Sequence, residues 1–111
     1  MRKGMSEEEA EIIRACCKVY RVRWHQIYSP LRTRKVADAR MCAMYLCYVL
    51  HGRSLNYIGE RFGRSHATVY HAVNTVADSP KIFRINEIRQ LLNQKTHNEH
   101  LHFSADQRKT D

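Results

Sequence analysis

The stretch SLNYIGERFGRSHATVYHAVNTV, residues 54–76, predicts two short helices joined by a tight turn. Ser54 and Ser65 stand where N-caps belong, and Gly63 interrupts the helical pattern between them. Apolar residues recur at helical spacing in both halves: Leu55, Ile58 and Phe62, then Val69, Ala72, Val73 and Val76. Gly59, inside the first helix, costs about 1 kcal/mol relative to alanine, so we expect another helix to cross it closely.

A crossed helix pair with a glycine-containing turn is typical of the helix-turn-helix, whose second helix enters the DNA major groove. Counted from Leu55, the apolar and small residues fall at the positions that this unit needs. Arg64 is a departure, because an apolar residue is frequent at its position. The alternative interpretation is a generic helical hairpin within a bundle.

The rest of the chain predicts helices and no strands. Further helices are expected over residues 7–20, 24–28 (a short helix or turn), 36–50 and 80–93. The helix over 36–50 is apolar nearly all round, so we expect it to be central and most buried. We expect Trp24, Ile27 and Tyr28 to seal one end of the core, and Ile82 to belong to the apolar face of the last helix.

The predicted fold class is therefore all-α, a small helical bundle with a helix-turn-helix. Residues 1–95 are expected to form a single domain. Residues 96–111 have no amphipathic period and are expected to be a flexible tail.

Charge favours nucleic acid as a partner. The 19 Lys and Arg outnumber 11 Asp and Glu, which gives a formal net charge of +8 and a pI near 9.6. Such a pI is typical of nucleic-acid binders, although a merely basic soluble protein or a membrane-surface binder is an alternative. The basic loop, residues 32–35, contributes to this charge; by itself it could be a solvated face.

Other classes lack support in the sequence. No apolar run approaches the roughly 18 residues that span a membrane, and the start has no signal-peptide core. The cysteines form no C-x-x-C pair, which favours reduced, buried thiols in a cytoplasmic protein. No catalytic constellation or cofactor site stands out, so we expect a non-enzyme without cofactors. His97, His100 and His102 are weakly ligand-like, and metal binding is a minor alternative.

The run RTRKVADARMCAMYLCYVLHGRSLNYIGERFGRSHATVYHAV, residues 32–73, resembles the C-terminal DNA-binding domain of the bacterial replication initiator DnaA. The shared elements are an arginine-rich loop, R-x-x-A-M-x-L, and S-L-x-x-I-G-x-x-F-G-R-x-H-x-T-V-x-H-A, within a similarity over roughly residues 8–77. The resemblance implies a helical bundle related to the Trp-repressor type. It also implies monomeric binding to a short, non-palindromic duplex, with the recognition helix in the major groove and a loop arginine in the minor groove.

The resemblance assigns roles to matching positions. Arg32 matches the minor-groove arginine, and Arg34 and Arg40 match arginines that contact the DNA backbone. The positions that match the recognition turn and helix are Arg64, His66, Thr68 and His71.

Physical chemistry extends these assignments. We expect phosphate neutralisation from Arg32, Arg34, Lys35, Arg40 and Arg53. The amides of Leu55 and Asn56 begin a helix and suit phosphate. Base edges are expected to face Arg64, Ser65, His66, Ala67 and Thr68. His66 has two alternatives, capping its own helix or touching phosphate, and His71 has the alternative of packing in the core.

The departures concern the target sequence. The family's G-G-R-D-H-T-T is here shorter by one glycine, with Ser65 in place of an aspartate and Ala67 in place of a threonine. Serine is a shorter, uncharged hydrogen-bonding group, and alanine keeps only a methyl contact. Asp38 and Ala39 replace an arginine and a proline after the basic loop. We expect the fold and DNA binding to survive, with an altered preferred site.

We therefore expect a standalone, sequence-specific double-stranded DNA-binding protein that regulates replication or transcription. The sequence contains no G-x-x-x-x-G-K-[ST], so we expect a protein without the ATPase module of the full-length initiator. It is expected in the bacterial cytoplasm at the nucleoid, host- or phage-encoded, with replication or transcription proteins as further partners. The alternative function is a protein-interaction module, such as an antagonist of the initiator, without specific DNA readout.

Overall fold

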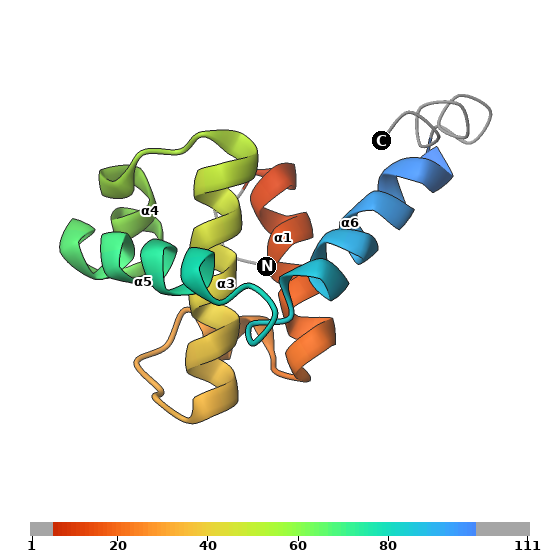
Figure 1. Cartoon of the computed structure of the whole chain (residues 1–111). Helices are drawn as coiled ribbons and strands as arrows, with labels where there is room; N and C mark the ends of the chain where they lie inside the picture. The colour runs from red at the N-terminus through yellow and green to blue at the C-terminus, as the bar shows by residue number, and fades with distance from the viewer. Residues whose placement is uncertain (1–5, 100–111) are drawn as a thin grey trace.

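A computed structural model describes residues 6–99, and this part of the chain is a bundle of helices without strands (Figure 1). The helices are α1 (Glu7–Tyr20), α2 (Trp24–Ile27), α3 (Arg34–His51), α4 (Leu55–Phe62), α5 (His66–Asp78) and α6 (Ile85–Glu99). The predicted all-α class is confirmed. No helix within the described residues is long and apolar enough to cross a bilayer.

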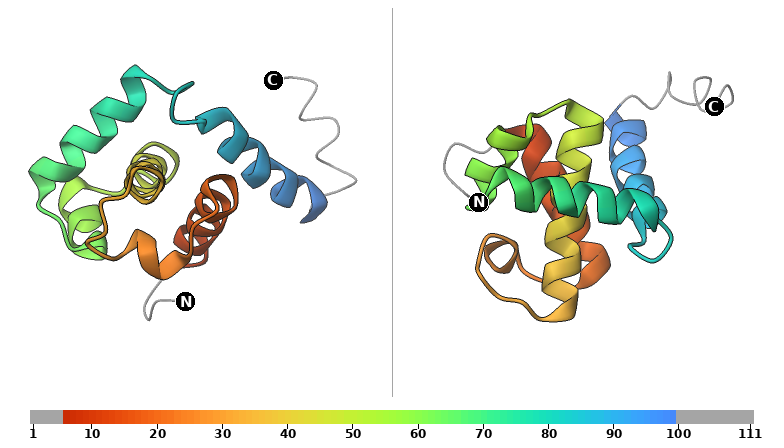
Figure 2. Two further views of the ribbon diagram at one scale, coloured as in Figure 1. Left: turned by 90° about the horizontal axis from the view of Figure 1, so that it is seen from below. Right: turned by 60° about the vertical axis from the view of Figure 1, so that its left-hand side comes forward.

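Helix α3 is the axis of the bundle. The view along it places α5 and α1 on opposite sides (Figure 2, left), and α6 packs on α1. The side chains of Val36, Ala39, Leu46 and other inward-facing residues of α3 are buried. Its last turns differ from the expectation of burial all round, because α5 crosses the helix near its middle (Figure 1). In these last turns, the described structure shows exposed side chains at Tyr48, Val49 and Leu50.

The ends of two helices differ from their predicted positions. Helix α3 begins at Arg34 rather than Val36, so half of the basic loop belongs to its first turn. Helix α6 begins only at Ile85, because the Tyr20 hydroxyl donates to the Phe83 carbonyl at 2.7 Å and fixes a turn there. Ile82 consequently lies outside the helix and is 67% exposed, contrary to its expected place on the apolar face.

The C-terminal boundary also differs from the expected one. Helix α6 continues beyond Asn93 to Glu99, through residues such as Gln94 and Lys95 that favour helices. The remainder of the predicted tail, residues 100–111, lies outside the described residues, as do residues 1–5. Trp24 does not seal the core, since its side chain is 39% exposed, whereas Ile27 one turn later is fully buried.

The thiols are buried as expected. Cys16, Cys42 and Cys47 are part of the core, and Cys17 packs against it. Burial raises the pKa of Cys42 and of Cys47 to about 12. Such thiols stay protonated at neutral pH and act as small apolar side chains.

A buried carboxylate connects the helix-turn-helix to the rest of the bundle. Glu9, in the first turn of α1, is 5% exposed. Its Oε1 accepts from Arg61 Nε of α4 at 2.9 Å, and its Oε2 accepts from the Tyr28 hydroxyl. The Tyr28 ring stacks on Phe62 of α4 with ring centroids 5.1 Å apart. Burial and then the bond to Glu9 raise the pKa of Tyr28, so the phenol remains a donor.

Gly59 is required by the turn after its own helix. A Cβ at this position would lie 2.5 Å from the carbonyl oxygen of Arg64. The expected close approach is therefore real, but it comes from the backbone of the turn rather than from a crossing helix. The Arg64 amide also donates to the Gly59 carbonyl at 2.8 Å, which holds the turn against α4.

We predict that Gly59→Ala destabilises the protein. The added methyl group displaces turn backbone, which costs about 1–3 kcal/mol and outweighs the helix propensity gained by alanine. Urea unfolding followed by circular dichroism measures the change. Glu60→Ala, at the exposed neighbouring position, is the control; equal stability of the two variants would contradict the steric argument.

We predict that Arg61→Ala destabilises the fold by about 3–5 kcal/mol, because it leaves the Glu9 carboxylate buried without its cation. The exposed ion pair of Arg14 with Glu7 provides the control, and Arg14→Ala is expected to change stability by less than about 1 kcal/mol. The denaturant midpoints of unfolding of both variants measure these changes in stability. A midpoint for Arg61→Ala close to that of Arg14→Ala would show that Glu9 does not depend on this arginine.

Candidate nucleic-acid interface

The predicted helix-turn-helix is present as α4, a turn and α5. Ser54 caps α4 by accepting from the Tyr57 amide at 3.0 Å, and Ser65 caps α5 by accepting from the Thr68 amide at 3.2 Å. Gly63 ends α4 with φ +68°, a conformation that favours glycine. The predicted apolar face of α5 (Val69, Ala72, Val73 and Val76) is buried.

The other face of α5 is open to solvent at its first turn. His66, Ala67 and Thr68 are all exposed. His71 is exposed as well, with Nε2 3.4 Å from the Thr75 hydroxyl, so it does not pack in the core. Because Ser65 supplies the cap, His66 does not cap its own helix. The first turn of α5 therefore presents a row of small and polar side chains.

Two further exposed residues of α5 were not among the predicted contact residues. Tyr70 is 59% exposed and lies one helical turn after His66, and Asn74 is exposed one turn after Tyr70. The helical period supplied the signal, since neither residue falls on the buried face. Asparagine is a residue that can pair with adenine in a major groove.

The basic loop and the start of α3 carry exposed cations. Arg32 is exposed, and Arg34 and Lys35 occupy the first turn of α3, which has no acidic residue. Cations there oppose the helix dipole, so an anion at this end would be favourable. Arg34 Nε lies 3.3 Å from Asp38 Oδ2, but the arginine side chain stays 85% exposed.

Arg40 occupies a different environment from the one expected. It is 6% exposed, and its guanidinium donates to four backbone carbonyls. These are the carbonyls of Gln26 (3.1 Å), Ile27 (2.7 Å), Ser29 (2.7 Å) and Leu31 (2.9 Å). This placement argues against the expected phosphate contact, because these donors are already used inside the protein. Arg40 instead holds the segment that leads into the basic loop.

Arg64 is likewise engaged within the protein. Its Nη1 donates to the Phe62 carbonyl at 2.7 Å, and its Nη2 donates to the Ser29 carbonyl at 2.9 Å. The carbonyl of Ser29 therefore accepts from both Arg40 and Arg64. We call this arrangement of Arg40, the Ser29 carbonyl and Arg64 the arginine bridge. The bond from Arg64 to Ser29 holds the segment that leads into the basic loop against the turn of the helix-turn-helix.

The bridge concentrates positive charge. Burial, and then the charge of Arg64, lower the pKa of Arg40 to about 10. Burial and then the charge of Arg32 lower the pKa of Arg64. The charge of Arg64 thus acts on Arg40, and the charge of Arg32 acts on Arg64. Repulsion between these like charges favours an anion at Arg32, the exposed arginine of the three.

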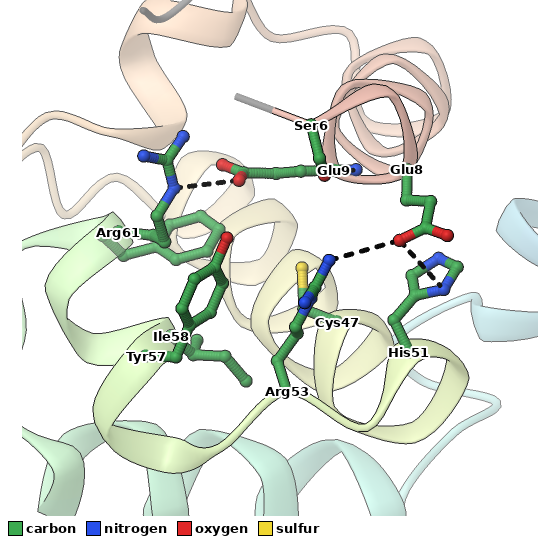
Figure 3. Close-up of a pocket in the computed structure, with 10 residues that line it drawn as sticks. Ser6, Glu8, Glu9, Cys47, His51, Arg53, Tyr57, Ile58 and Arg61 are labelled. Carbon is green, nitrogen blue, oxygen red and sulfur yellow. Dashed lines mark hydrogen bonds and ion pairs between the residues drawn. The ribbon is translucent and has the colours of Figure 1, made fainter. Parts of the chain in front are cut away.

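Arg53 lies at the start of α4, where it is held by α1. Its Nη2 is 3.3 Å from Glu8 Oε1, and its guanidinium sits over the Tyr57 ring, 5.1 Å from the centroid (Figure 3). Glu8 also approaches His51 Nδ1 at 3.8 Å. Leu55 and Asn56 form the first turn of α4, and Asn56 is exposed. The expected phosphate site thus has an acidic neighbour.

The three histidines of the minor metal-binding alternative belong to the C-terminal end of the chain. The side chains of His97, His100 and His102 lie outside the part of the chain whose side chains are described. Among the described residues, no three His, Cys, Asp or Glu side chains are grouped to hold a metal ion.

Comparison with known proteins now identifies the family. The model of the bacterial DnaA protein helix-turn-helix matches residues 10–76, which include the loop, the turn and all but the end of α5. The chain belongs to this family.

Individual relatives agree with that assignment. The chromosomal replication initiator protein DnaA of Sphingopyxis alaskensis is 47% identical over 89 residues, which cover 75% of this chain and 20% of the relative. The proteins of the same name from Bartonella quintana and Thermoanaerobacter sp. are 48% identical over 69 residues and 40% identical over 65. These matches cover 61% and 59% of this chain but 14% and 15% of the relatives. The chain thus matches about a fifth or less of each relative.

We predict that Ser65→Ala and Ser65→Asp separate the two duties of this position. Loss of the cap in Ser65→Ala costs about 0.5–2 kcal/mol, whereas aspartate keeps the cap and restores the residue expected from the family pattern. Denaturant unfolding measures stability, and selection from a random duplex library measures sequence preference. Ala67→Thr is the control, since it changes an exposed side chain of the same turn without touching the cap. Unchanged preference in both Ser65→Asp and Ala67→Thr would show that these positions do not face bases.

Proposed function

We propose that this domain binds double-stranded DNA as a monomer through two adjacent grooves and acts in replication initiation or its control. The observation that carries the proposal is that Arg32 and the first turn of α5 are exposed on neighbouring elements that the bond from Arg64 to Ser29 ties together. A helix start enters the major groove, and an arginine on a flanking loop suits the narrow minor groove.

The chemical roles follow from exposure. His66, Ala67 and Thr68 face base edges from the first turn of α5, and His71 lies one turn further along the same helix. Phosphates are neutralised by Arg34 and Lys35, and by Arg53 after it leaves Glu8. The amides of Leu55 and Asn56 receive a phosphate at the start of α4. All these groups come from residues 32–71, so one copy of the domain carries the whole interface.

The replication role rests on the relatives. These relatives are chromosomal replication initiator proteins, and the shared region includes the loop and the helix-turn-helix. Because Ser65 and Ala67 differ from the family pattern, we propose a preferred sequence different from the one that DnaA reads.

We predict that Arg32→Ala and His66→Ala each weaken binding to the preferred duplex about tenfold, with helical circular dichroism unchanged, because both side chains are exposed. The preferred duplex comes from selection in a random library, and fluorescence anisotropy measures its dissociation constant. Lys18→Ala is the control and is expected to bind like the parent. Lys18 is exposed on α1, and α1 lies across α3 from α5 (Figure 2, left).

The salt dependence tests the same proposal without knowledge of the sequence. Each phosphate contact contributes a slope of about −0.9 to the plot of log K against log salt concentration. A parent protein with no measurable slope would contradict DNA binding. It would favour a protein-interaction module built on the same fold.

A further inference from the structure

We infer that Arg40 and Arg64 are positioning residues, which set the distance between the minor-groove arginine and the recognition helix. Both were expected to contact DNA themselves. The inference rests on the proposed function, and it changes the role of these two residues from contact to alignment.

The loop that carries Arg32 is held from inside the protein. Residues 28–33 belong to no helix, and Arg32 is exposed near their end. The buried guanidinium of Arg40 donates to the carbonyls of Ser29 (2.7 Å) and Leu31 (2.9 Å), on either side of Pro30. An irregular segment with its carbonyls held from inside the protein has less freedom to move. Arg40 therefore fixes the base of the loop that carries Arg32.

The turn of the helix-turn-helix is held to the base of this loop. Arg64 immediately precedes Ser65, the N-cap of α5. Its Nη1 is held by the Phe62 carbonyl and its Nη2 by the Ser29 carbonyl. One planar guanidinium thus contacts the end of α4 and the base of the loop at the same time. The loop is 35 residues from Arg64 in sequence, and this bond joins it to the entrance of the recognition helix.

Arginine and lysine differ in the contacts that they can make at position 64. Arginine presents several N–H groups in a rigid plane, whereas lysine presents one ammonium group on a flexible chain. Lysine at position 64 keeps the charge but cannot reproduce both carbonyl contacts in the same geometry. A residue that acts by charge on a phosphate tolerates lysine, and a residue that acts through the arginine bridge does not. The substitution Arg64→Lys therefore separates the two roles.

The test is a double-mutant cycle of Arg64→Lys with Arg32→Ala on the preferred duplex. We expect Arg64→Lys to weaken binding about fivefold in the parent and by less than about twofold when Arg32 is already absent. The salt slope is expected to stay unchanged in Arg64→Lys. Arg34→Ala is the matched control: it lowers the slope by about 1, and its effect adds to that of Arg32→Ala.

A second measurement needs no DNA. Trypsin cleaves after Arg and Lys, and the loop with the start of α3 offers Arg32, Arg34 and Lys35. We expect Arg64→Lys and Arg40→Lys to speed cleavage at residues 32–35 several-fold, because the loop opens more often. Lys18→Ala is expected to leave this rate unchanged. Circular dichroism establishes that each variant is folded before it is compared.

Two results would overturn the inference. One is an additive cycle in which Arg64→Lys binds like the parent while Arg64→Ala loses about one unit of salt slope, the behaviour of a phosphate contact. The other is unchanged trypsin cleavage of the loop in Arg64→Lys. If the parent protein itself shows no salt-dependent duplex binding, the proposed function fails, and the cleavage rates still decide whether the bridge holds the loop.

Discussion

The buried carboxylate of Glu9 is the constraint on which the arrangement of the helices depends. A carboxylate removed from water must be paired, and its partners Arg61 and Tyr28 come from α4 and from the end of α2. The first turn of α1, the entrance to the basic loop and the first helix of the helix-turn-helix therefore meet at one point. The entrance to the basic loop and α4 are therefore joined through Glu9 within the protein itself.

The positive charge of the chain serves two purposes. Arg40, Arg61 and Arg64 direct their guanidinium groups at carbonyls and a carboxylate inside the domain, whereas Arg32 and Lys35 face solvent. Inward arginines give a planar, directional contact that lysine cannot replace, and outward cations give attraction that depends mainly on charge. Three of the 19 Lys and Arg are therefore engaged inside the domain and are less available to phosphates than the outward cations.

Local signals made the helix-turn-helix predictable. Ser54, Gly63 and Ser65 fix the ends of α4 and α5 through bonds to residues at most four positions away, and such bonds can be read from a sequence. The inward role of Arg40 could not be read, because its partners are backbone carbonyls, which every residue possesses. The start of α6 was also missed, since it depends on a bond between Tyr20 and the carbonyl of Phe83, 63 residues apart. Contacts of that kind follow from tertiary structure alone.

The cap of the recognition helix restricts how the target sequence can evolve. Ser65 offers a side-chain oxygen to the Thr68 amide, so only a few small polar residues preserve this cap. Ala67, one residue into the helix, has no such duty and is exposed. In the proposed docking, a change of the preferred site is therefore open to many side chains at position 67, whereas position 65 keeps its cap only with serine, threonine, aspartate or asparagine.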